Sequence, residues 1–196
     1  DLDFDNKELT SQEFISLAKT IAVELRRQGF DVETSVSERK AIHCHVRFSN
    51  ILFENELSNI KSEKIDIQID TFDQGYKYES ELYLLNKFNV LKQIRITPKS
   101  IILSQKFWTI TRRNRAKGRD FYDILYLLQN TTPDMGFLNL KFNTSNWGDT
   151  KKKILEGIKD VDLELAVKDI SPFLIDTQES KKIMLFREYI EQIEFE

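Results

Sequence analysis

Residues 64–70 constrain the fold most, because they alternate strictly between polar and apolar side chains. Ile65, Ile67 and Ile69 would face one side of a strand, and the charged and amide side chains would face the other. This alternation is typical of a strand in a sheet that has one covered face and one polar face. The segment therefore predicts a β-strand, with Asp66 pointing off its polar face.

The first thirty residues predict a strand followed by an amphipathic helix. Residues 1–4 alternate as Asp-Leu-Asp-Phe, which places both carboxylates on one face of a strand. Thr10 and Glu13 have the spacing of a capping box, which marks a helix N-terminus. Apolar residues recur at helical spacing over residues 14–25, and Gly29 is the expected stop.

The remainder of the chain reads as a mixed α/β half followed by a helical half. We expect further strands at residues 30–36, 42–53 and 90–97, and a turn at 73–78. After Pro98 we expect helices at residues 101–109, 120–128, 151–158, 163–167 and 180–193. The predicted fold class is α/β (α+β), with a catalytic-type domain at 1–97 and a helical domain at 98–196.

Composition excludes several classes of protein. Hydrophobic residues make up 40 % and charged residues 31 % of the 196 residues, as in ordinary globular proteins. No apolar run approaches the roughly 20 residues that span a bilayer, so no membrane association is expected. Cys44 is the single cysteine, which fits a reducing compartment such as the cytoplasm. The chain begins at Asp1 within a strand pattern, and we expect further residues upstream.

Three carboxylates form the first candidate site. If the strands that carry Asp1, Asp3 and Asp66 are neighbours, these side chains converge, and their mutual repulsion calls for a divalent cation. Oxygen ligands with open coordination positions suit Mg²⁺ (or Mn²⁺), completed by substrate phosphates. The alternative is that the acids only form the solvated face of edge strands.

A basic segment forms the second candidate site. The fourteen residues from Lys106 to Arg119 contain no acid. Such a density of like charge requires either an anionic partner or open water, so a solvated loop is the alternative. Arginine offers bidentate contacts to phosphate, and lysine a point charge. The cations of the segment are Lys106, Arg112, Arg113, Arg115, Lys117 and Arg119.

Two acids follow this basic segment. Asp120 lies near a predicted helix N-terminus, where an acid interacts well with the helix dipole. Asp123 lies one turn further along and neighbours Asp120 on the helix surface. These two acids could instead orient Lys106 or a substrate.

Two other groups carry less weight. His43 and His45 share a strand face, but Cys44 points the other way, so a four-ligand zinc site is out of reach. The triplet Lys151–Lys153 is expected at a helix-start surface, where contact with an RNA backbone is the alternative.

Four segments together resemble the AbiEii-type nucleotidyltransferase toxins, which belong to the DNA polymerase β-like nucleotidyltransferase superfamily. They are Asp-Leu-Asp-Phe at 1–4, Lys-Ile-Asp-Ile at 64–67, Gln-Lys-Phe at 105–107 and Arg-Asp-Phe-Tyr-Asp-Ile at 119–124. The order and spacing extend over residues 1 to about 128. The Arg-Asp-x-Tyr-Asp piece after a lysine-bearing helix is the most specific part.

The resemblance implies a nucleotidyltransferase fold with a mixed sheet, and it implies roles for particular residues. Asp1 and Asp3 match the metal-binding acid pair, and Asp66 matches the third acid. Lys106 matches a lysine that holds nucleotide phosphates, with Arg119 and Asp120 beside it. Either Asp120 or Asp123 matches the acid of the last motif, and we favour Asp123. The chain departs from the family pattern at Gln105, where glutamate is common, and the family's glycine-rich turn would lie upstream of Asp1.

The implied function is transfer of a nucleotide from an NTP to a hydroxyl acceptor, with Mg²⁺ required and the active site between the two halves. Relatives that modify tRNA suggest an RNA 3′ end, tRNA in particular, as the acceptor. Arg112, Arg113 and Arg115 would contact that RNA. A toxin–antitoxin or phage-defence setting follows, with a cognate antitoxin as a partner whose pairing in this family is often indirect. The alternative is a non-catalytic nucleotide- or RNA-binding module that retains the fold.

Overall fold

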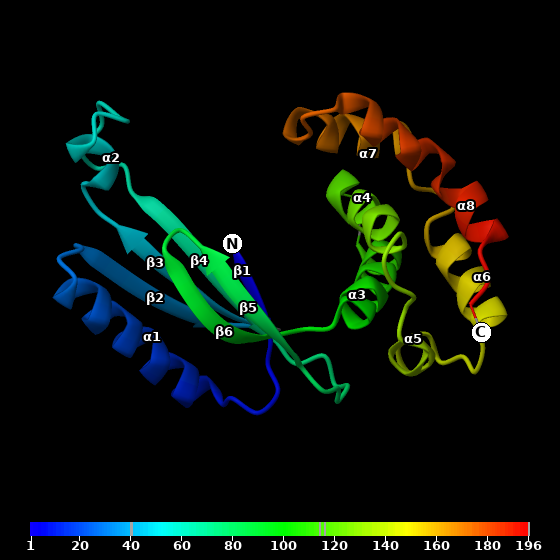
Figure 1. The fold of residues 1–196 in the computed structure, drawn as a ribbon, viewed down its shortest axis with the longest axis horizontal. Helices are drawn as coiled ribbons and strands as arrows, with labels where there is room; N and C mark the ends of the chain where they lie inside the picture. The colour runs from blue at the N-terminus through cyan, green and yellow to red at the C-terminus, as the bar shows by residue number, and fades with distance from the viewer. Residues whose placement is uncertain (40, 114, 116, 196) are drawn as a thin grey trace. The chain divides into compact units, whose positions relative to one another are not determined.

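The computed structural model describes residues 1–39, 41–113, 115 and 117–195, and two compact units divide the chain after Lys77. The first unit contains a four-stranded sheet with strand order β1-β4-β3-β2 (Figure 1). β1 runs parallel to β4, whereas β3 is antiparallel to both of its neighbours. The sheet is therefore mixed, as predicted. Its strands are β1 (Leu2–Asp5), β2 (Val32–Glu38), β3 (Ile42–Phe48) and β4 (Ile65–Phe72).

Helix α1 (Ser11–Arg27) packs against the apolar face of this sheet. The predicted capping box is present, because the Glu13 N–H donates to Thr10 Oγ1 and the Thr10 N–H donates to Glu13 Oε2. Phe14 and Ala18 of α1 join Cys44 and other apolar side chains in one small core. With its apolar face covered by α1, the sheet presents its alternate residues on the opposite face.

The predicted strand at residues 42–53 is too long, because β3 ends at Phe48. Asn50 adopts a left-handed conformation with φ of 65°, which an extended strand does not allow. The short helix α2 (Ile51–Glu54) begins directly after it. The apolar residues Ile51 to Phe53 therefore belong to a helical turn that returns the chain towards β4.

The second unit begins with a β-hairpin of β5 (Glu81–Lys87) and β6 (Val90–Ile96). Phe88 and Asn89 form its turn, and both have positive φ, of 51° and 62°, as in a type I′ turn. The predicted domain boundary after residue 97 lies at the end of this hairpin, which belongs to the same compact unit as the helices that follow. The strand β5 is absent from the sequence prediction.

Helices form the rest of the second unit around a single core. Phe107, Phe121, Leu138, Ile154 and Phe186 are fully buried within it. Within the described ranges, no helix combines the length and apolar composition that crossing a membrane requires. The helices are α3 (Lys99–Arg112), α4 (Gly118–Leu127), α5 (Met135–Phe142), α6 (Trp147–Gly157), α7 (Leu163–Ile170) and α8 (Phe186–Gln192), with 3₁₀ segments at Ser171–Phe173 and Thr177–Leu185.

Candidate functional site

Asp3 lies on the polar face of the first unit's sheet. The strand register places Asp3 of β1 beside Asp70 of β4, and Asp70 lies beside His43 of β3. Asp1 precedes Asp3 by two residues, and side chains two apart on an extended chain point to the same face. Both are exposed. The predicted acid pair therefore lies on the sheet face that α1 leaves uncovered.

Asp66 shares this polar face, but it lies four residues before Asp70. At about 3.3 Å per residue, the offset is about 13 Å along β4, so Asp66 is not the neighbour of Asp3. Its carboxylate lies 3.0 Å from His45 Nδ1 and 3.6 Å from Arg47 Nε. The structure thus does not bring Asp1, Asp3 and Asp66 together as closely as the sequence predicted. In the described part of the chain, no three His, Cys, Asp or Glu side chains gather closely enough to hold a metal ion.

Asp70 is the acid that sequence reasoning missed. His43 Nδ1 lies 2.8 Å from Asp70 Oδ1, and the amide of Gln68 donates to both carboxylate oxygens, at 2.9 and 2.8 Å. Burial acts to raise the pKa of Asp70, but these hydrogen bonds and the nearby histidines outweigh it and hold that pKa below its usual value. The alternation of residues 64–70 placed Asp70 on the correct face. The parallel register with β1, which makes it the partner of Asp3, leaves no local signal in the sequence.

The two histidines share this polar face, as predicted, while Cys44 between them is buried in the apolar core. Each histidine pairs with a different acid of β4: His43 pairs with its register partner Asp70, whereas His45, which lies opposite Gln68, reaches diagonally to Asp66. The polar face therefore carries two His–Asp pairs in addition to Asp1 and Asp3.

A second charged group lies in the helical unit, where α3 packs against α4. The ammonium nitrogen of Lys106 lies 3.0 Å from Asp120 Oδ1 and 2.7 Å from Asp123 Oδ2. Burial acts to lower the pKa of Lys106, but the two carboxylates outweigh it and hold that pKa above its usual value. The structure thus brings together three residues that the sequence singled out. The two acids hold Lys106, which is one of the roles that the sequence allowed for them.

Asp120 is almost fully buried, at 2 % side-chain exposure, and it also holds Arg113. The Arg113 guanidinium lies 2.7 Å from Asp120 Oδ2, which makes an ion pair, although its N–H groups do not point at that oxygen in hydrogen-bond geometry. One buried acid therefore fixes two cations, one from α3 and one from the segment that follows α3. Arg113 was predicted to contact RNA, and in the structure it pairs with Asp120.

The other described cations of the basic segment, which follow Lys106, are also exposed. The Arg112 guanidinium stacks on the Trp108 ring, 4.1 Å from its centroid. Arg115 and Arg119 are exposed, and Arg115 lines a small cavity with acids of the α6–α7 region. Residues 114 and 116 of this segment lie outside the described part of the chain.

Gly118 sets the position of α4 and so of Asp120. A Cβ atom at residue 118 would lie 1.9 Å from the carbonyl oxygen of Ala166 in α7, so only glycine allows this approach of the two helices. The Gly118 N–H also donates to Asp169 Oδ2 at 2.9 Å. Both contacts fix the start of α4 against α7, two residues before the buried acid.

A family model described as the nucleotidyl transferase AbiEii toxin of a type IV toxin–antitoxin system matches residues 1–184. The chain belongs to the AbiEii family. The match includes the whole first unit and most of the second, so the polar sheet face and the Lys106–Asp120–Asp123 group both lie within the AbiEii region. No characterised protein and no solved structure matched the chain.

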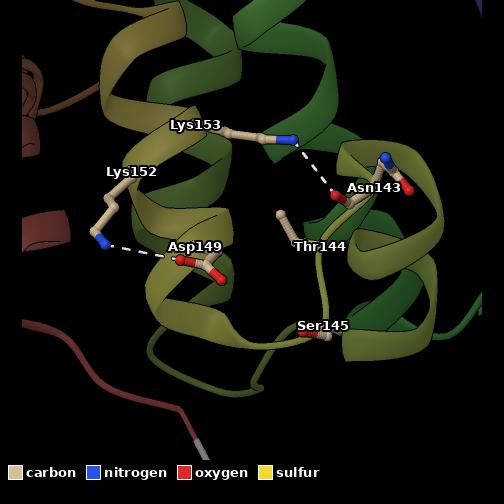
Figure 2. Close-up of a pocket in the computed structure, with 6 residues that line it drawn as sticks. All are labelled: Asn143, Thr144, Ser145, Asp149, Lys152 and Lys153. Carbon is tan, nitrogen blue, oxygen red and sulfur yellow. Dashed lines mark hydrogen bonds and ion pairs between the residues drawn. The ribbon is translucent and has the colours of Figure 1, made fainter.

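Two further cavities of this AbiEii chain are lined by neither the candidate carboxylates nor the basic segment. One, of about 590 Å³, is lined by Asn143, Thr144, Asp149 and two lysines between α5 and α6 (Figure 2). Lys153 there donates to the Phe142 carbonyl oxygen, at 2.7 Å. Lys151, nearby on α6, pairs with Glu194. Lys151 and Lys153 of the predicted surface triplet are thus bound to other groups of the protein. The other cavity, of about 690 Å³, lies between β1 and α1 on the apolar side of the sheet.

Proposed function

We propose that this AbiEii toxin transfers a nucleotide from an NTP to the 3′ end of an RNA, tRNA in particular, in the cytoplasm of its host. The observation that supports this most is the polar sheet face that α1 leaves uncovered. It carries Asp3 of β1 and Asp66 of β4, with Asp1 directly before β1, in a chain of the nucleotidyl transferase family. Asp1 and Asp3 are exposed on this face, so a triphosphate could reach their carboxylates. A cognate antitoxin is the expected partner, because the family belongs to toxin–antitoxin systems.

Asp1 and Asp3 are the proposed ligands of Mg²⁺ (or Mn²⁺). Asp66, the expected third acid, lies four residues from the register partner of Asp3, so the ion at Asp1 and Asp3 would not share it in this arrangement. Mg²⁺ commonly takes one or two protein carboxylates and completes its shell with water and substrate phosphates, so a closed three-carboxylate group is not required. The oxygen donors of Asp1 and Asp3 fit this pattern. When bound, the ion would neutralise triphosphate charge and favour ionisation of the acceptor hydroxyl.

Lys106 is the proposed phosphate-binding residue of the second unit. Asp120 is buried and holds Lys106 in place, whereas Asp123 is 41 % exposed. A phosphate oxygen would therefore compete with Asp123, rather than with Asp120, for the ammonium group. Arg119 and Asp120 belong to the same nucleotide-binding region, and we assign Asp123 the catalytic role of the last motif's acid.

Arg112, Arg113 and Arg115 are the proposed RNA contacts. Their segment is basic in a chain of net charge −3, which concentrates positive potential in one place. Because Arg113 already pairs with Asp120, Arg112 and Arg115 carry more of the expected contact with phosphates.

Incubating the protein with each α-labelled NTP, total cellular RNA and Mg²⁺ tests the proposal. Label should appear in RNA with at least one NTP, and Asp3→Ala should remove it while the protein remains folded by circular dichroism. The offset of Asp66 from Asp3 favours one rival, a module that binds nucleotide or RNA without transferring anything. Nucleotide binding without label in RNA or protein would support that rival.

A further inference from the structure

We infer that His43, oriented by Asp70, accepts the proton of the acceptor hydroxyl during nucleotide transfer; this rests on the proposed function. His43 and Asp70 lie in one row with Asp3 across the polar face. Asp70 of β4 is the register partner of Asp3 of β1 on one side and of His43 of β3 on the other. Strands in a sheet lie about 4.8 Å apart, so His43 is about 10 Å from Asp3 between Cα atoms, a span that one bound phosphate and hydroxyl can bridge.

The His43–Asp70 pair has the geometry of an oriented base. His43 Nδ1 lies 2.8 Å from Asp70 Oδ1, and the two side chains are 31 % and 26 % exposed. A carboxylate on Nδ1 stabilises the tautomer that carries its hydrogen there, which leaves Nε2 with a lone pair. Gln68 binds both oxygens of Asp70, so the carboxylate is itself held in place.

Asp70 is better suited to orienting a histidine than to binding a metal ion. Both of its oxygens already accept hydrogen bonds, from Gln68 and His43. Its charge persists in the folded protein, and a charged partner stabilises the imidazolium that forms when His43 takes a proton. Asp70 would therefore act through His43, as a positioning residue.

The described strands place few charged groups beside His43 on the polar face. Asp70 faces it from β4, with Asp3 of β1 beyond, and His45 is its neighbour on β3. The register partner from β2 is Ser37, which has no charge. His45 is the weaker candidate because its acid, Asp66, also interacts with Arg47 and lies in a row further from Asp3.

Atoms and electrons balance in the proposed step. The O–H bond of the acceptor hydroxyl breaks, and its proton moves to Nε2 of His43. The oxygen forms a bond to the α-phosphorus of the NTP, and the bond from that phosphorus to the bridging oxygen of the β-phosphate breaks. Pyrophosphate leaves with that electron pair.

The test measures label transfer from the NTP to RNA as a function of pH, at saturating NTP and Mg²⁺. The wild-type rate should fall on acidification, because a protonated imidazole cannot accept the proton of the hydroxyl. His43→Gln keeps a donor for Asp70 but cannot accept a proton. It should lower the rate by about 100-fold or more and abolish this acid limb. Imidazole added to His43→Ala should restore part of the rate.

Ser37→Ala is the matched control, because Ser37 is the exposed register partner of His43 and lies outside the proposed machinery. It should keep the wild-type rate and pH profile, and thermal melts should show all variants folded. The proton-transfer role is overturned if His43→Gln retains the acid limb, or if added imidazole restores none of the rate that His43→Ala loses.

Asp3→Ala separates this inference from the proposed function. Transfer that needs Asp3 but not His43 overturns the role of His43 and leaves the transferase intact. Absence of transfer by the wild-type protein with every NTP and acceptor overturns both.

Discussion

The ammonium nitrogen of Lys106 lies 3.0 Å from Oδ1 of Asp120, a side chain that is only 2 % exposed. The two residues come from successive helices, and Arg113 contacts the other oxygen of the same carboxylate. A single buried acid therefore joins α3, α4 and the segment between them. Lys106 also pairs with Asp123, but Asp120 is the member that both cations share.

Asp120→Ala should lower the free energy of unfolding by about 3 kcal/mol, because it leaves two cations without their buried partner. Asp123→Ala is the matched control: it removes the same group from the same lysine, but Asp123 is 41 % exposed, so the loss should be about 1 kcal/mol or less. Urea denaturation followed by circular dichroism measures both. Equal losses in the two variants would contradict the assignment of Asp120 as the structural member.

Gly118→Ala should destabilise the helical unit by about 2 to 3 kcal/mol, the upper part of the range for overpacking, because its Cβ would lie 1.9 Å from the Ala166 carbonyl oxygen. Gly148→Ala serves as the control, since the nearest atom to its Cβ, on Asn146, lies 3.4 Å away. Alanine favours a helix over glycine, so that change should be neutral or stabilising by about 0.5 kcal/mol. A Gly118→Ala protein that unfolds at the wild-type urea midpoint would show that α4 and α7 do not approach as described.

Asp70 predicts an acid-dependent part of the stability. Its pKa is lowered in the folded protein, so its contribution is fully present above the unfolded value of 3.8 and is lost as pH falls through the lower folded value. The difference in free energy of unfolding between wild type and Asp70→Asn should therefore be constant near neutral pH and shrink below pH 3.8. Urea titrations at several pH values measure it. A difference that grew on acidification would mean that the pKa of Asp70 is raised.

Part of this arrangement was predictable from local patterns. The alternation of residues 64–70 predicted β4 and the face of Asp66, and Thr10 with Glu13 predicted the start of α1, because both signals arise from neighbouring residues. Helical spacing put Asp120 and Asp123 side by side, and holding Lys106 was one of the roles that the sequence allowed for them.

Other parts depend on contacts between distant segments. The pairing of Asp3 with Asp70 rather than Asp66 follows from the parallel register of β1 and β4, which alternation alone cannot fix, because a shift of two or four residues keeps every side chain on the same face. Gly118 looked like an ordinary residue of a basic segment, and only the approach of α7 reveals its role. Helix α5 was missed because it lacks a clear amphipathic period.

Lys106→Ala should raise the KM for the NTP about 10-fold or more, because it removes a charge-assisted contact to phosphate. Lys106→Arg should restore part of the affinity, since arginine keeps the charge but not the geometry that Asp120 imposes. Steady-state transfer assays with the preferred NTP measure both, and thermal melts account for any loss of folded protein. An unchanged KM in folded Lys106→Ala would remove Lys106 from the nucleotide site and leave it as a structural partner of Asp120.

Arg112→Ala combined with Arg115→Ala should lower RNA labelling more than it lowers NTP binding. Both arginines are exposed and belong to the basic segment, whereas Arg113 pairs with Asp120, so this double change avoids the buried ion pairs. RNA binding by the wild type should weaken as salt rises. In the double variant, the slope against the logarithm of salt concentration should become shallower by roughly 1 for each phosphate that the protein no longer neutralises. Lys159→Ala combined with Lys182→Ala removes the same charge from side chains that are 56 % and 57 % exposed elsewhere, and it should keep the wild-type slope. Equal effects of the two double variants would show that only net charge matters. Label on protein and never on RNA would exclude the RNA acceptor and leave the transferase activity. A protein hydroxyl as acceptor would need no basic surface.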